Sequence, residues 1–275
     1  MKVGSFLSQT NENNGKNVKS HIYFARTYRY LHTSIGQNVL YILLLIVPCL
    51  FLLIFFMDDI TYGLSSLAVK VLGSVFAHHE FSILGEDFAL LNTMAYVGLP
   101  TVYPQLSFVF WNMLVMFVVL LILGFGRAKG KPVTIYLMLN LIVHLANCIY
   151  FIFAMDYFPY SATQFSELYM EQQMGIWITF IILTALVTGF LGNKGYVYRV
   201  ITFFAIMAYS FLFGTVRYIV FMFLVTRFSI LYMAPMFFSF GPLFDFLYLV
   251  AIYSVFVNRM VKLYDSAEGR GEWRW

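Results

Sequence analysis

Residues 198–253 decide the fold of this chain, because they hold two apolar runs that flank a short aromatic loop. They read YRVITFFAIMAYSFLFGTVRYIVFMFLV (198–225), TRFSILYMAPMFFSFG (226–241) and PLFDFLYLVAIY (242–253). A bilayer core about 30 Å thick needs about 20 apolar residues per helical crossing, so we interpret this stretch as a membrane hairpin. Each run carries one charge within its apolar part, Arg217 and Asp245, and charges within hydrocarbon seldom face lipid.

The composition of the whole chain is typical of a polytopic membrane protein. Its 275 residues are 61% hydrophobic and only 11% charged, whereas a soluble domain carries about 25% charged residues. Cys49 and Cys148 both fall inside predicted spans, which excludes a disulfide framework or a C-x-x-C metal site. The sequence has no Walker A loop, no G-x-S-x-G elbow and no H-E-x-x-H motif. We therefore expect no cofactor, no metal and no nucleic-acid partner, and the sequence favours a protein without enzymatic activity while leaving that question open.

The apolar runs predict six membrane spans with both termini in the cytoplasm. With that orientation, fourteen of the seventeen basic residues fall in inner segments and acidic residues gather in outer ones, as the positive-inside rule requires. We therefore expect a multi-pass protein of the cell membrane, such as a bacterial inner membrane. The expected spans are 38–57, 106–125, 132–155, 174–192, 199–225 and 242–257.

Between the first two spans the pattern changes from continuous to periodic. Apolar residues there follow a helical spacing that predicts an amphipathic helix over 60–77, either on the outer face or packed against the bundle. The stretch 78–105 mixes acids, glycines and prolines, and we expect an irregular or partly β re-entrant cap. The apolar stripe consists of Leu64, Leu67, Ala68, Val71, Leu72 and Val75.

The expected fold class is thus an all-α integral membrane bundle with an extracytoplasmic cap. A cytoplasmic tail and interfacial segment (1–37) precede the six-span domain (38–257), whose cap covers about 58–105, and a second cytoplasmic tail (258–275) follows.

Two octapeptides indicate a possible internal repeat. Residues 163–170 (TQFSELYM) and 226–233 (TRFSILYM) agree at six of eight positions with an offset of 63. A duplication would place Tyr169 and Tyr232 at equivalent positions on the outer surface. Chance similarity in so biased a composition is the alternative.

Arg217 and Asp245 are the first candidate site. Both lie in the outer half of the predicted hairpin and are expected to meet across it. Such a pair either locks the two helices together or offers Arg217 as a grip for an anion or carboxylate from outside.

A polar seam is the second candidate site. His144 lies near the centre of the third span, and Asn140 and Asn147 share its helical face at i−4 and i+3. With Asn112 of the preceding span, these side chains predict interhelical hydrogen bonds. A proton relay through His144 is the alternative.

The hairpin FGTVRYIVFMFLV…FGPLFDFLYLVAIY resembles the membrane core of exosortases and archaeosortases, in which an N-x-x-R-[IL] arginine lies near the outer end of a span. Asn147 in LANCIYFIF is similar to the asparagine of that motif, although Tyr150 stands in place of its arginine. The amphipathic helix before an outer cap also resembles that family, over roughly residues 60–257. Its members resemble cysteine transpeptidases with an outward cysteine, arginine and histidine. Only Arg217 carries over, so the resemblance implies a relative without the catalytic thiol and base.

These features together predict a non-catalytic membrane subunit or assembly factor of an envelope export or polysaccharide system. Its expected partners are the lipid bilayer and other membrane-protein subunits, and it should present a broad apolar flank. A small carrier or flippase-like transporter is one alternative, and it predicts a cavity at mid-depth lined by Asn140, His144 and Asn147. An outer-face transferase acting on a lipid-linked substrate is the other, and it predicts a pocket that opens outward over Arg217.

Overall fold

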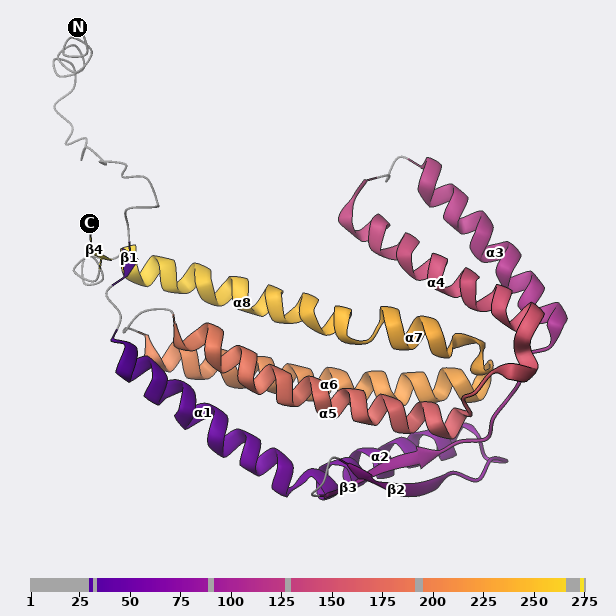
Figure 1. The fold of residues 1–275 in the computed structure, drawn as a ribbon, viewed down its shortest axis with the longest axis horizontal. Coiled ribbons are helices and arrows are strands. Elements are labelled where there is room, and N and C mark those ends of the chain that lie inside the picture. Colours follow the sequence, from indigo (N-terminus) through magenta and orange to yellow (C-terminus); the bar gives the residue numbers. More distant parts are fainter. Residues whose placement is uncertain are drawn as a thin grey trace, which may run out of the picture.

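The computed structural model describes residues 30–31, 34–88, 92–126, 130–190, 195–265 and 273–274. Four helices run along the long axis of the molecule and form its bundle (Figure 1). Two of them, at 28 and 32 residues, reach about 42 and 48 Å at 1.5 Å per residue. The four are α1 (Ile35–Phe55), α5 (Ala162–Gly189), α6 (Tyr196–Arg227) and α8 (Pro242–Asp265).

The two ends of the bundle differ in what they carry. At one end, which we call the terminal end, a short strand from each end of the chain pairs in antiparallel fashion. At the other, the hairpin end, lie a helix, a β-hairpin and two short helical segments. The first pair is β1 (Tyr30–Leu31) and β4 (Trp273–Arg274); the second group is α2 (Met57–Val75), β2 (Ser82–Phe88), β3 (Asn92–Gly98), the 3₁₀ turn η3 (Ile230–Tyr232) and α7 (Met233–Ser239).

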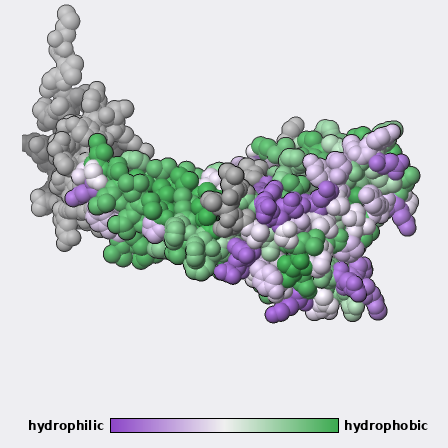
Figure 2. Space-filling view, turned by 60° about the horizontal axis from the view of Figure 1, so that its bottom comes forward, coloured by the Kyte–Doolittle hydropathy of each residue, from purple (hydrophilic) through white to green (hydrophobic). Residues whose placement is uncertain are grey.

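The prediction of an all-α protein with six membrane spans is confirmed. Six helices in the described chain are long and apolar enough to cross a bilayer, and hydrophobic surface dominates the terminal half while polar surface gathers over the hairpin half (Figure 2). The fourth span is wrong at its start, because α5 begins at Ala162 rather than near 174. Its first turns contain polar residues such as Ser166 and Gln173, and these are buried against other elements.

Two spans leave the bundle and form an arm, which we define as α3 (Leu106–Phe125) and α4 (Pro132–Ala154) with the 3₁₀ turn η2 (Met155–Tyr157) after them. The two helices pack against each other, and α4 also contacts α7 and η3. Of the 20 residues of α3, Val109 alone is buried. The arm diverges from α8 (Figure 1), whereas the sequence predicts six spans in one bundle. Uniformly apolar helices lack a stripe that selects a packing partner.

The predicted amphipathic helix is present as α2, but its apolar stripe is only half correct. Leu64, Ala68 and Leu72 are buried, whereas the other half of the stripe is exposed. The helix turns Thr61 and Ser65 inward instead, because the neighbouring strand β3 offers them backbone hydrogen bonds. The exposed half consists of Leu67 (45%), Val71 (39%) and Val75 (57%).

The predicted partly β cap is confirmed as the hairpin β2–β3, in which Ser82 pairs with Gly98 and Phe88 with Asn92. Strand β3 is buried between α2, α5 and α6, and side chains of these helices bond the backbone along the edge of β3 that β2 leaves open. An open strand edge inside a membrane protein would leave polar groups unsatisfied, so these bonds hold the hairpin against the helices. Thr61 and Ser65 bond Ala95, Ser166 and Tyr218 bond Val97, and Thr163 bonds Leu99.

The two octapeptides of the possible repeat adopt different structures. Residues 163–170 lie within α5, whereas 226–233 run from the end of α6 through η3 into α7. Tyr169 is buried in the bundle at 1% exposure, while Tyr232 lies in η3. The expected equivalence of these two tyrosines on the outer surface is wrong.

Candidate functional site

A break between α7 and α8 forms the centre of the first candidate site. Phe240 and Gly241 separate the two helices, which otherwise follow one another along the bundle (Figure 1). A Cβ added to Gly241 would lie 2.3 Å from the carbonyl oxygen of Phe237. The backbone can therefore fold back this closely only with glycine at this position.

Arg217 of α6 reaches this break and bonds both sides of it. Its Nη1 donates to the carbonyl oxygens of Phe240 at 2.8 Å and Gly241 at 3.2 Å. Its Nη2 donates to Asp245 Oδ2 at 2.8 Å and to Gln173 Oε1 at 2.9 Å. Both charged side chains are almost fully buried, so the ion pair is enclosed within the bundle.

The charges of the pair match the backbone on either side of the break. The last carbonyls of α7 have no partner within that helix, and the guanidinium of Arg217 supplies donors to the carbonyls that follow. Asp245 lies in the first turn of α8, where a negative charge interacts favourably with the helix dipole. The arrangement stabilises an interrupted membrane helix.

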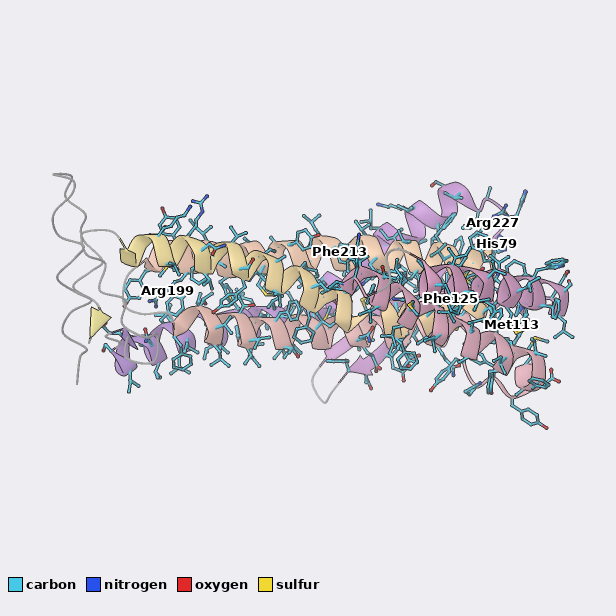
Figure 3. The ribbon with its side chains drawn as sticks, turned by 90° about the horizontal axis from the view of Figure 1, so that it is seen from above. His79, Met113, Phe125, Arg199, Phe213 and Arg227 are labelled. Carbon is cyan, nitrogen blue, oxygen red and sulfur yellow. The ribbon has the colours of Figure 1, made fainter. Side chains whose placement is uncertain are left out.

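Aromatic rings and an amide complete the surroundings of Arg217. The guanidinium carbon lies 5.5 Å from the ring centroid of Tyr169 and 5.6 Å from that of Phe213, distances at which cation–π attraction operates. Gly214 makes room for Gln173, since a Cβ there would approach the amide carbon of Gln173 to 2.6 Å. Figure 3 labels Phe213 near the middle of the bundle.

Sequence reasoning missed Gln173 and Tyr169 at this site. Both precede residue 174, where the predicted fourth span begins. A glycine in an apolar span, Gly214, is the one signal in the sequence that a polar side chain from a neighbouring helix comes close.

In the predicted polar seam, three of the four expected residues come together. Asn112 Oδ1 lies 3.2 Å from His144 Nε2, and Asn147 Nδ2 donates to the carbonyl oxygen of Leu231. Asn140 instead donates to the carbonyl oxygen of Tyr136 within its own helix at 2.9 Å. The seam therefore connects the arm to η3 rather than running the length of α4.

Tyr232 is a member of the seam that the sequence did not indicate. Its hydroxyl accepts from Asn112 Nδ2 at 2.7 Å, and its ring stacks on His144 with centroids 5.1 Å apart. Burial raises the pKa of Tyr232 above its ordinary value, so the phenol stays protonated. The seam is a neutral hydrogen-bonded cluster that holds the arm on η3.

A groove of about 580 Å³ lies between α4, the segment that precedes α5, and α7. Of the polar seam, only Asn147 reaches it, and the Asn147 amide already donates to Leu231. The remaining lining is apolar or aromatic, which differs from the polar cavity that a carrier predicts. The groove is lined by Val143, Ala146, Asn147, Tyr150, Phe158, Pro159, Ala234 and Phe238.

Comparisons with known proteins give no match among family models, curated proteins or solved structures. The resemblance to exosortases and archaeosortases therefore stays a prediction. In the structure Cys49 lies on α1 and Cys148 is buried on α4, while Arg217 lies on α6.

Proposed function

We propose that this protein is a non-catalytic subunit or assembly factor of a larger membrane assembly, and that the arm binds its partner. The observation that carries the proposal is the exposure of the arm. Along α3 an apolar stripe at helical spacing is 45–64% exposed, and the helix makes most of its contacts with α4. The stripe consists of Trp111, Val115, Val118 and Ile122.

The arm differs from the other spans in its position. α1 and α8 extend to the terminal end, whereas the arm lies beside the hairpin half of the molecule (Figure 1). Figure 3 places Phe125, the last residue of α3, nearer the hairpin end than Phe213, and far from Arg199 at the terminal end. The exposed side of the arm therefore lies away from the other spans, where a helix of a partner protein can pack against it.

The geometry of Arg217 supports the subunit over the two alternatives. All four Nη hydrogens of Arg217 have acceptors within the chain, so an anionic substrate could reach them only by displacing Asp245, Gln173 or a backbone carbonyl. The Nε hydrogen has no acceptor among the described residues, but the side chain is almost fully buried. The transferase and the carrier both need polar groups free to meet a substrate. The apolar groove beside α4 suits a helix or side chains of a partner better than a polar cargo.

The proposal also covers the membrane in which the protein lies, its orientation there and the system to which it belongs. Both chain ends approach the terminal end, where Arg259 and Lys262 lie in the last turns of α8. Acidic residues such as Glu86 and Glu167 lie in the hairpin half. This distribution supports cytoplasmic termini in a bacterial or archaeal cell membrane. The resemblance stated above supports a role in envelope export or polysaccharide assembly.

Copurification with matched variants tests the proposal. In the arm variant, Val115→Trp with Val118→Trp, both new side chains remain apolar, so membrane insertion is preserved while the stripe changes shape. The control is Leu44→Trp with Val47→Trp on α1, where the stripe of Leu40, Leu44, Val47 and Phe51 is 59–66% exposed at the same spacing. We expect a stoichiometric partner to be retained by wild type and control and lost from the arm variant. A lone protein in mild detergent, or equal retention by both variants, contradicts the proposal.

A further inference from the structure

The β-hairpin has one edge that side chains of neighbouring helices bond and one that they do not. Side chains of α2, α5 and α6 bond the far edge of β3, as described above. In an antiparallel ladder the backbone groups of successive residues point to opposite edges. Ala95 and Val97 direct theirs away from β2 toward these helices, and they pair with Gly85 and Ile83. The backbone groups of Ile83 and Gly85 therefore point away from β3.

The same alternation applies to Asp87, two residues further along. Strand β2 thus presents the N–H and C=O groups of Ile83, Gly85 and Asp87 along its outer edge, and none of these groups has a hydrogen-bond partner among the described residues. Gly85 and Asp87 are exposed, and Ile83 is half-buried. The outer edge of β2 is accessible along its length.

This edge lacks most of the features that usually prevent strand addition. Proteins protect exposed edges with proline, charged side chains (lysine above all), a bulge or a very short strand. The seven residues SILGEDF contain no proline and no lysine, and their pairing with β3 runs without interruption from Ser82 to Phe88. Their only charges are Glu86 and Asp87, so this regular edge is a template for a further strand that is compatible with negative charge.

Carboxylates lie near this edge and determine which charge a bound strand should carry. Glu86 and Asp87 lie on β2 itself, and Glu167 of α5 lies close by. Burial, with the carboxylates of Glu167 and Glu86, raises the pKa of Tyr96 on the neighbouring strand, which shows that these groups share one region. A strand that bears lysine or arginine is complementary to this region, and an acidic strand is repelled.

We propose that the outer edge of β2 binds an extended basic segment of a partner polypeptide by strand addition. The backbone of Ile83, Gly85 and Asp87 supplies the hydrogen bonds, and Glu86 and Asp87 select for positive charge. This site lies on the hairpin, apart from the arm, and the inference does not rest on the partner proposed for the arm.

Gly85 offers a matched pair of variants. Its N–H points outward, so Gly85→Pro removes one outward donor and blocks an added strand while leaving every β2–β3 hydrogen bond in place. Gly85→Ala keeps the N–H, and a Cβ there meets nothing within 4 Å. The probes are a fluorescent seven-residue peptide of alternating lysine and valine and its counterpart of alternating glutamate and valine, titrated into the full chain in detergent.

We expect the lysine peptide to bind and the glutamate peptide not to bind. Gly85→Pro should weaken binding about tenfold or more, the value of a lost hydrogen bond and a blocked strand, and Gly85→Ala should leave it unchanged. Glu86→Gln with Asp87→Asn should weaken binding and reduce its dependence on salt. Amide hydrogen exchange at Ile83, Gly85 and Asp87 should slow when the peptide is bound. Failure of the lysine peptide to bind, equal binding of both peptides, or binding that is indifferent to Gly85→Pro overturns the proposal.

Discussion

The arm is more apolar in sequence than the α5–α6 pair, and the two regions differ in almost every contact. α5 buries 15 of its 28 residues, whereas α3 buries one of 20. The two long helices are also joined at their centre, since Gln173 of α5 accepts from Arg217 of α6. The arm contacts the rest of the described chain mainly through α4, which packs on η3 and α7 and reaches Phe240 through Tyr136.

The difference shows that hydrophobicity takes a helix into a membrane without choosing its neighbours. Between membrane helices, small residues and polar side chains provide the specific contacts. α5 and α6 have both, in Gly214 and in Gln173 with Arg217. In the arm, the polar side chains that bond another helix or η3 are Asn112, His144 and Asn147.

Arg217→Ala removes the side chain that joins α6 to α5 and should have the largest effect on stability. The substitution leaves the Asp245 carboxylate buried without its cation and removes donors from two carbonyls, so it should cost about 3–5 kcal/mol of unfolding free energy. Thermal unfolding followed by circular dichroism in detergent measures the loss.

Two controls accompany that measurement. Arg259→Ala changes an exposed arginine on α8 and should stay within about 0.5 kcal/mol of wild type. Arg217→Met combined with Asp245→Leu removes both charges and should be more stable than Arg217→Ala alone. A loss of unfolding free energy below about 1 kcal/mol for Arg217→Ala would show that the ion pair does not stabilise the break between α7 and α8.

Gly214→Ala tests the close approach of α5 and α6 and should cause a smaller loss of unfolding free energy. The new methyl group approaches the Gln173 amide to 2.6 Å and displaces an acceptor of Arg217, which should cost about 1–3 kcal/mol. Gly175→Ala is the matched control on α5, where a Cβ meets nothing within 4 Å; it should stabilise the protein by about 0.5–1 kcal/mol. The same unfolding assay measures both variants, and an equal effect at the two glycines would refute the close approach at Gly214.

Asn147→Ala tests the arm and should have the smallest effect on global stability. It removes a single hydrogen bond to η3, worth about 1 kcal/mol, yet that bond lies in the small region that holds the arm. We expect a broader distribution of distances between spin labels on the arm and on α8, with little change in the unfolding midpoint. Asn140→Ala, whose amide bonds its own helix, should leave the distribution narrow. Identical distributions for the two variants would contradict a role for the seam in holding the arm.

Much of the bundle could be predicted from local sequence. Continuous apolar runs mark the membrane helices, and Arg217 and Asp245 stand out because charges in such runs are rare. The partly β cap was also predictable, because alternating apolar residues, glycines and acids interrupt the pattern between 78 and 105.

The rest depends on contacts between distant residues. Ser166 and Gln173 look like loop residues until β3 and Arg217 supply their hydrogen-bond partners. Thr61 faces inward on α2 for the same reason, against the apolar periodicity of that helix. The divergence of the arm has no local signal, since α3 is apolar on every side apart from Asn112 and Ser107 near its start.

The central claim is that the arm binds a protein partner while the bundle is complete in itself. Photo-crosslinking in intact membranes tests it most directly, with a photoreactive phenylalanine analogue placed at Val118 on the arm or at Leu44 on α1. The account predicts a discrete protein adduct from position 118 and only lipid adducts from position 44. Lipid adducts alone at both positions, or the same protein adduct at both, would contradict it.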